Sequence, residues 1–340
     1  MDTNPLDERK ERILRQIVEG YVRAGEPVGS RSVADDPALD VSAATVRNEM
    51  GILEREGYIT HPHTSAGRIP TDKGYRYYVD RLSDVDLTPE LRKEIRTFLD
   101  GTLSAFDDML RRSSDLLAEL TEYTSVTTAP PASEARLRRV QLIALGGSRV
   151  LLVLIGEVPW HEEHVVQLPP GAEPTDASLV RTVEVADRTV GGKTLAESAD
   201  ALDDVDGGDE EERTILRATA EAIRVIALRA RRVYTGGTSR VVIWEPGPEA
   251  KRVLELLEGG EVESLLLESE PEEVAVRIGR ELGISDLEDL SMIATGYRFG
   301  RRSGALGVLG PTRMDYPSVI ATVGEVARSL SRALRQLSES

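Results

Sequence analysis

The chain has 340 residues, a formal charge of −17 and no cysteine. This length suggests two or three domains, and the lack of cysteine excludes disulfides, a thiol nucleophile and a thiolate zinc site. The sequence has no run of some eighteen apolar residues, and its charged N-terminus is unlike a signal sequence. We therefore expect a soluble, cytoplasmic protein.

The negative charge lies mainly outside the first 82 residues. Those residues hold 12 Lys and Arg against 14 Asp and Glu, whereas the rest of the chain holds 30 against 45. Binding of nucleic acid by these first 82 residues is thus compatible with the acidic total, although their nonspecific attraction to DNA would be modest. Only five of the 42 basic residues are lysine, which fits either a G+C-rich genome or a salt-rich cytoplasm.

The first 85 residues have the order helix, helix, helix, hairpin. Asp7 to Ala24 has apolar residues at helical spacing, and a short second helix begins at Ser30. A third helix begins after Ser42 as N-cap and ends at Gly57, a residue that readily takes a positive φ. This order is typical of a winged helix-turn-helix, which we expect at residues 1–85.

The third helix predicts one packing face and one DNA-reading face. At 100° per residue, the packing face comprises Ala43, Val46, Met50 and Leu53. The opposite face comprises Ala44, Arg47, Asn48, Gly51 and Arg55. Arg can contact guanine through two hydrogen bonds, and Asn can do so with adenine. The predicted base-proximal residues are Ser42, Thr45, Arg47 and Asn48.

A polar hairpin follows the third helix and would form the wing. Tyr58 to His61 and Arg68-Ile69 alternate like short strands, and Thr71 caps a helix expected at 72–82. Phosphate contacts use Arg, Lys, hydroxyl and backbone N–H groups. The predicted phosphate and wing residues are Ser30, Arg31, His63, Thr64, Arg68, Lys73 and Arg76. A winged helix that contacts only protein is the alternative.

Beyond the hairpin, the pattern predicts a helical connector and then a sheet. The connector, expected at 86–130, begins at Thr88-Pro89-Glu90 and leads into a Pro-rich linker at 127–133. Gly146-Gly147 would join the first two strands of the sheet as a hairpin. The expected strands are 139–145, 149–155, 164–168, 291–298 and 305–309, all in one antiparallel sheet. An insertion at 195–270 would interrupt this sheet and contain a long helix at 211–233.

Two motifs resemble the HrcA family of heat-inducible repressors of bacterial chaperone operons. They are SAATVRNEMGILEREGYITHPHTSAGRIPTDKGYRYYVD near the N-terminus and IATGYRFGRRSGALGVLGPTRMDYPSVI near the C-terminus, in the family's order. The resemblance implies an α+β multidomain fold: an N-terminal winged helix-turn-helix, a GAF-like α/β body at 131–194 and 271–340, and an inserted dimerisation domain at 195–270. It also implies a homodimer that binds double-stranded DNA at an inverted-repeat operator and is released on heat stress, with a GroEL-type chaperonin as a further partner.

The rival hypothesis is a ligand-sensing GAF-like regulator whose winged helix contacts protein. Gly296-Tyr297 and Arg313 to Tyr316 would then line a pocket, whereas in the simpler interpretation Arg313 pairs with Asp315 or a neighbouring carboxylate. An enzyme is disfavoured, since Gly192-Lys193-Thr194 lacks the first glycine of a phosphate-binding loop. His161 and His164 have the wrong spacing for a metalloprotease helix. We expect no metal, cofactor or catalytic residue.

Overall fold

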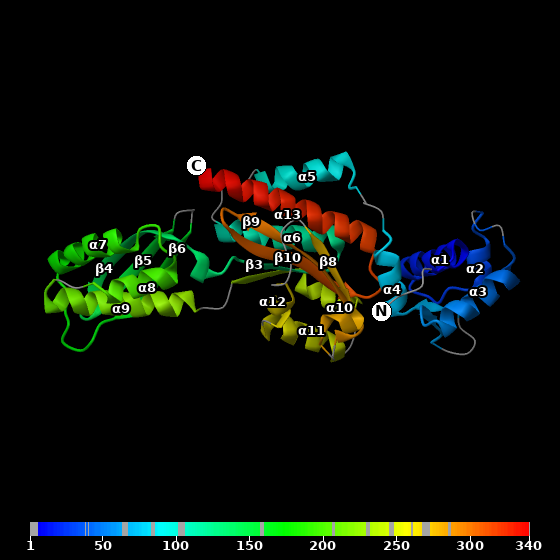
Figure 1. Ribbon diagram of the computed structural model, residues 1–340, viewed down its shortest axis with the longest axis horizontal. Helices are drawn as coiled ribbons and strands as arrows, with labels where there is room; N and C mark the ends of the chain where they lie inside the picture. The colour runs from blue at the N-terminus through cyan, green and yellow to red at the C-terminus, as the bar shows by residue number, and fades with distance from the viewer. Residues whose placement is uncertain are drawn as a thin grey trace.

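The computed structural model shows a multidomain chain of mixed helix and sheet, as expected. It describes residues 6–37, 39, 41–62, 67–82, 86–100, 106–156, 160–205, 208–228, 232–244, 248–259, 261–266, 273–284 and 287–339. Three regions follow one another along the longest axis (Figure 1). Among the described helices, none is long and apolar enough to cross a membrane.

The N-terminal region, residues 6–82, has the predicted order of elements. These are α1 (Glu8–Ala24), α2 (Ser30–Ala34), α3 (Ala43–Arg55), β1 (Ile59–Thr60), β2 (Ile69–Pro70) and α4 (Asp72–Val79). Both predicted N-caps are confirmed: Ser42 accepts a hydrogen bond from the Thr45 N–H at 3.2 Å, and Thr71 accepts one from the Gly74 N–H at 3.2 Å. Gly57 has a φ of 79° directly after the third helix, which also agrees with prediction.

The central region is built on a five-stranded sheet in the order β7-β3-β10-β9-β8. Its strands are β3 (Thr124–Thr128), β7 (Val233–Gly236), β8 (Val274–Ile278), β9 (Leu290–Phe299) and β10 (Arg302–Pro311). One face packs on α6 (Phe106–Thr121) and α13 (Tyr316–Glu339), with α5 (Pro89–Asp100) on the outside of α13. The other face packs on α10 (Val241–Trp244), α11 (Pro248–Gly259) and α12 (Glu261–Leu266), as Figure 1 shows.

Two predictions about the central region are wrong. The residues expected as a linker at 127–133 begin inside β3, a fully buried strand hydrogen-bonded on both sides by β7 and β10. The expected connector at 86–130 also includes α6, which packs against β3 and β7 and so belongs to the core of the central region.

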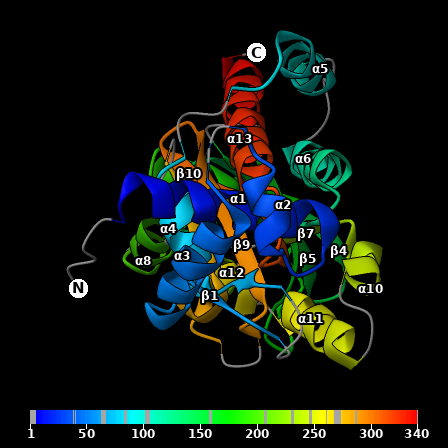
Figure 2. The ribbon, with the colours of Figure 1, turned by 90° about the vertical axis from the view of Figure 1, so that its right-hand side faces the viewer.

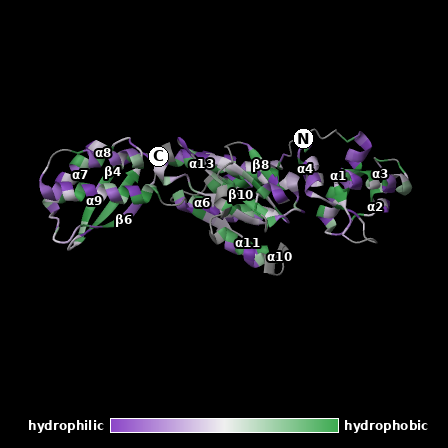
Figure 3. Ribbon diagram, turned by 60° about the horizontal axis from the view of Figure 1, so that its bottom comes forward, coloured by the Kyte–Doolittle hydropathy of each residue, from purple (hydrophilic) through white to green (hydrophobic). Residues whose placement is uncertain are grey.

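The remaining strands form a separate three-stranded sheet, so the single-sheet prediction is also wrong. This unit contains β4 (Leu137–Gly146), β5 (Arg149–Gly156), β6 (His161–Gln167), α7 (Asp176–Val190), α8 (Leu195–Asp203) and α9 (Glu210–Ala227). The helices α7 and α9 pack on the sheet, α8 packs against both of them, and the unit has a core of its own. The expected insertion at 195–270 and the expected body segment at 131–194 are therefore wrong: the unit that interrupts the central region runs from β4 to α9, and β7 to α12 belong to the central region. Figure 3 shows hydrophobic residues along the strands of both sheets.

The helix α4 joins the N-terminal region to the central region. The ring of Tyr75 lies 5.7 Å from that of Tyr316, measured between centroids, and burial raises the pKa of both phenols. Arg76 forms an ion pair with Glu281 and donates from Nη2 to the Val276 carbonyl at 2.6 Å. Viewed along the long axis, the N-terminal helices lie in front of the sheet (Figure 2). These contacts fix the position of the N-terminal region, and thus of α3, relative to the central region.

Leu152→Ala should destabilise the three-stranded unit by about 2 to 5 kcal/mol, because Leu152 is fully buried and its truncation leaves a cavity. Denaturant unfolding of the full chain measures the loss. Leu228→Ala is the matched control, since Leu228 is 85% exposed and its truncation should change the free energy of unfolding by less than about 0.5 kcal/mol. Equal effects of the two variants would contradict a separate core beneath this sheet.

Candidate nucleic-acid interface

The helix α3 separates a buried face from an exposed one, as predicted. Val46 and Leu53 are fully buried and Met50 nearly so, while Arg47 and Asn48 on the opposite side are exposed. Among the described residues, Arg47 has no side-chain partner, so its guanidinium keeps all of its hydrogen-bond donors available. The exposed face can therefore offer both an Arg and an Asn to a ligand with hydrogen-bonding edges.

Ser42 and Thr45 lie at the start of the same helix, beside Arg47. Their hydroxyls are 3.0 Å apart, and Ser42 also caps the helix. The Ser42 side chain therefore fixes the first turn of α3, and Thr45 is half-buried beside it. Both predicted residues are close to the exposed face, but part of their hydrogen-bonding capacity is used inside the chain.

A three-residue cluster ties the hairpin to the last turn of α3. One Glu54 oxygen contacts Nδ1 of His61, and the other accepts from Nε and Nη2 of Arg68 at 3.1 and 2.9 Å. Burial would raise the pKa of Glu54, but the hydrogen bonds from His61 and Arg68 together lower it. Sequence reasoning missed Glu54, because its only signal was a carboxylate near the helix end with basic residues on both strands that follow.

The other predicted phosphate residues have different surroundings. Lys73 donates to the Glu56 carbonyl at 2.8 Å and lies over the Tyr58 ring, so it fastens α4 to the end of α3. Arg76 points to the central region, where Glu281 and Val276 hold it. Its cationic group is thus engaged at the junction between the two regions, and its predicted contact with phosphate stays a prediction.

Two predicted residues lie at the start of α2, and two lie outside the described residues. Ser30 is half-buried and Arg31 exposed at the start of α2, the helix that packs against α3. His63 and Thr64 belong to the tip of the hairpin, which the structure does not describe. Their predicted contacts with phosphate stay predictions.

The two segments predicted to share a ligand pocket lie at different cavities. Gly296 lines a cavity of about 310 Å³ between β9 and α13, whereas Arg313 to Tyr316 line one of about 470 Å³ beside α1 and α4. Tyr297 lines neither and donates to the Thr128 carbonyl at 2.9 Å. The predicted pairing of Arg313 with a carboxylate is absent from the described part of the chain.

The two sequence patterns that resembled a phosphate-binding loop and a metalloprotease helix lie in or next to ordinary helices and strands. Lys193 donates to the Thr189 carbonyl, and Thr194 caps α8. His161 and His164 lie on β6, and within the described ranges no three His, Cys, Asp or Glu side chains come together as a metal site would require.

Comparison with known proteins gives matches over nearly the whole chain. The model of the HrcA protein C terminal domain matches residues 107–320. The heat-inducible transcription repressor HrcA of Parafrankia sp. is 40% identical, covering 97% of this chain and 99% of that protein. That of Clavibacter michiganensis is 41% identical over the same shares. A crystal structure of a hypothetical protein is 25% identical, with a TM-score of 0.67 over 98% of this chain and 100% of that one.

Glu54→Gln should weaken the attachment of the hairpin and lower stability by less than about 1 kcal/mol, because the cluster is partly exposed. Since the folded state lowers the pKa of Glu54, this stabilisation is full above the usual carboxyl pKa and is lost as pH falls through the lowered value. Thermal unfolding at several pH values should thus show wild type and variant converging in acid. Glu56→Gln, an exposed neighbour, should show no such convergence.

Proposed function

Because the chain belongs to the HrcA family and is thus a heat-inducible transcription repressor and not an enzyme, we propose that it binds operator DNA through α3. A homodimer would place one α3 in each of two major grooves of an inverted repeat. Half-sites would then be about 34 to 36 Å apart, or a multiple of that distance.

The exposed pair Arg47 and Asn48 carries this proposal. Their neighbours Ala44 and Gly51 are small, so the helix axis can come close to base edges. Arg31 and the cluster of Glu54, His61 and Arg68 lie on the elements that flank α3. In this arrangement Glu54 holds the hairpin against α3, and the hairpin contacts the phosphate backbone.

The proposed dimer uses the open face of the three-stranded sheet. Ile143, Leu151 and Val165 form one cross-strand row on the face opposite the three helices, and Ile143 and Val165 are 48% and 51% exposed. Such a row favours a matching apolar surface. In a dimer whose twofold axis runs parallel to the strands, the edge strand β4 of one copy would face the edge strand β6 of the other. Arg139 on β4 would then lie near Glu163 on β6, and their opposite charges favour a second copy of the same chain as the partner.

The repressor would be released from DNA on heat stress, and the family resemblance implies that a GroEL-type chaperonin takes part in this regulation. We propose this partner on the family relation alone, since it does not follow from a particular surface. The competing hypothesis, a ligand sensor whose N-terminal region contacts protein, requires no preference for any DNA sequence.

Asn48→Ala should weaken operator binding by about 1 to 3 kcal/mol and relax the preference at one base pair of each half-site, because a bidentate contact to adenine is lost. Competition binding with single-base operator variants measures this. Gln16→Ala removes an amide from α1 in the same region and should leave affinity and preference unchanged. An unchanged base preference in Asn48→Ala would refute the proposed docking.

Val165→Asp should convert the dimer into monomers, because burying an unpaired carboxylate against an apolar row is costly. Sedimentation analysis of the variant gives the mass directly. Leu228→Asp, on a side chain that is 85% exposed at the end of α9, should remain dimeric. A dimeric Val165→Asp variant would place the interface elsewhere.

A further inference from the structure

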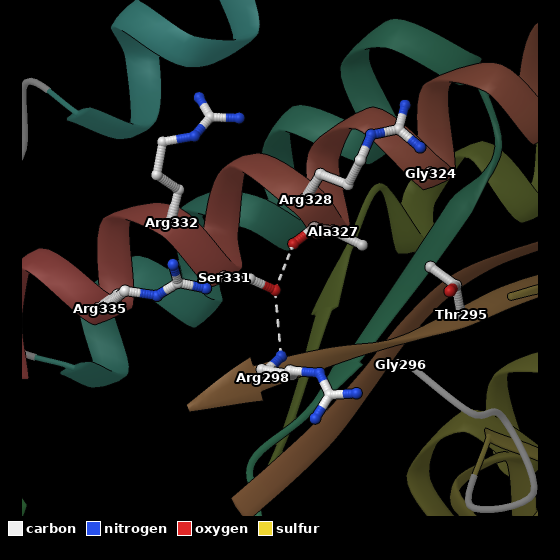
Figure 4. Close-up of a pocket in the computed structure, with 9 residues that line it drawn as sticks. All are labelled: Thr295, Gly296, Arg298, Gly324, Ala327, Arg328, Ser331, Arg332 and Arg335. Carbon is white, nitrogen blue, oxygen red and sulfur yellow. Dashed lines mark hydrogen bonds between the residues drawn. The ribbon is translucent and has the colours of Figure 1, made fainter. Parts of the chain in front are cut away.

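A cavity of about 310 Å³ lies between β9 and α13 in the central region. Thr295, Gly296 and Arg298 line it from the strand, and the helix contributes Arg328, Arg332 and Arg335 (Figure 4). A hydrogen-bonded link fixes the two walls relative to each other, because Ser331 accepts from the Arg298 N–H at 3.0 Å and donates to the Ala327 carbonyl at 2.8 Å. We call this cavity the α13 pocket.

The charge of the α13 pocket is opposite to that of the chain. Four of its nine lining residues are Arg and none is acidic, although the protein carries a charge of −17. Arg328 pairs with Glu325 at 3.0 Å, from outside the lining. Arg332 has no ion pair with any described residue. The Arg332 guanidinium therefore carries a positive charge that no described carboxylate balances, and an anion in the pocket would be attracted to it.

The wall formed by β9 holds a second, independent feature. Thr295 is 1% exposed, faces the α13 side of the sheet and has a hydroxyl without a hydrogen-bond partner in the described structure. A buried hydroxyl normally finds a partner, and exceptions call for an explanation. A ligand with acceptor oxygens in the α13 pocket would supply the missing partner.

We propose that the α13 pocket binds a small phosphate-bearing anion. Guanidinium groups match phosphate with paired hydrogen bonds, and a phosphate also has oxygens left to accept from the Thr295 hydroxyl. The volume is at the small end of ligand pockets, which favours inorganic pyrophosphate or a phosphate with a small organic part. This site is separate from α3 and goes beyond the proposed DNA binding.

The pocket is connected to α5 through Glu325. This carboxylate is 2% exposed and lies 3.2 Å from Arg96 and 3.9 Å from Arg92, both on α5, as well as 3.0 Å from Arg328. An anion in the α13 pocket would compete with Glu325 for Arg328. Occupancy would therefore change how firmly Glu325 holds α5, the helix that follows the N-terminal region in sequence.

Calorimetric titration of the full-length protein with inorganic pyrophosphate, at constant ionic strength, tests the proposal. We expect saturable binding at one site per chain. Arg332→Gln should weaken it at least about tenfold, the size expected for a lost charge-assisted hydrogen bond. Thr295→Val should fold normally, because it removes an unpaired hydroxyl, and should weaken binding about threefold or more.

Arg217→Gln is the matched control, because it removes the same charge from an exposed site on α9. It should bind pyrophosphate as the wild type does. A titration with a nucleoside diphosphate shows whether the pocket also accepts an organic part. Lack of saturable binding by both probes would overturn the proposal. Equal weakening in Arg217→Gln and Arg332→Gln, or wild-type affinity in both Arg332→Gln and Thr295→Val, would do so as well.

Discussion

The short helix α4 belongs to two packed surfaces at once, and the presentation of α3 depends on it. On one side, the Tyr77 ring meets the Tyr58 ring edge-on at 5.3 Å, inside the N-terminal region. On the other, Tyr75 packs on Tyr316 at the start of α13. Buried residues of both regions form one continuous hydrophobic cluster, so the N-terminal region is not attached by a loose linker alone. A change in the central region can thereby reach α3, the helix that we propose binds DNA, through packed side chains.

Electrostatics assign the basic residues of the N-terminal region to different tasks. Arg68 is paired with Glu54, and Arg76 with Glu281. Arg81 lies over the Tyr77 ring. All three contacts hold elements together, and the two ion pairs also reduce the positive charge that is left to attract DNA. In the proposed docking, sequence preference therefore comes mainly from base contacts by α3, and the nonspecific affinity for DNA is weak even at low salt.

Local features of the N-terminal region could be predicted from sequence because each depends on neighbouring residues. Helix caps, the Gly57 turn and the two faces of α3 are of this kind. The strand β3 escaped because Thr and Ser dominate it and suggest solvent, whereas the sheet and α6 bury all five residues. The role of Arg76 escaped because its partner Glu281 is 205 residues away. The division into two sheets is likewise a long-range property, which alternation along single strands does not encode.

The most direct measurement is binding of the purified protein to an inverted-repeat chaperone-promoter duplex and to a scrambled duplex, titrated from low to molar salt. The account predicts two chains per inverted repeat and a preference for the repeat that persists as salt rises, because base contacts are screened less than phosphate contacts. Equal or absent binding to the two duplexes throughout, with the protein shown to be folded, would contradict it.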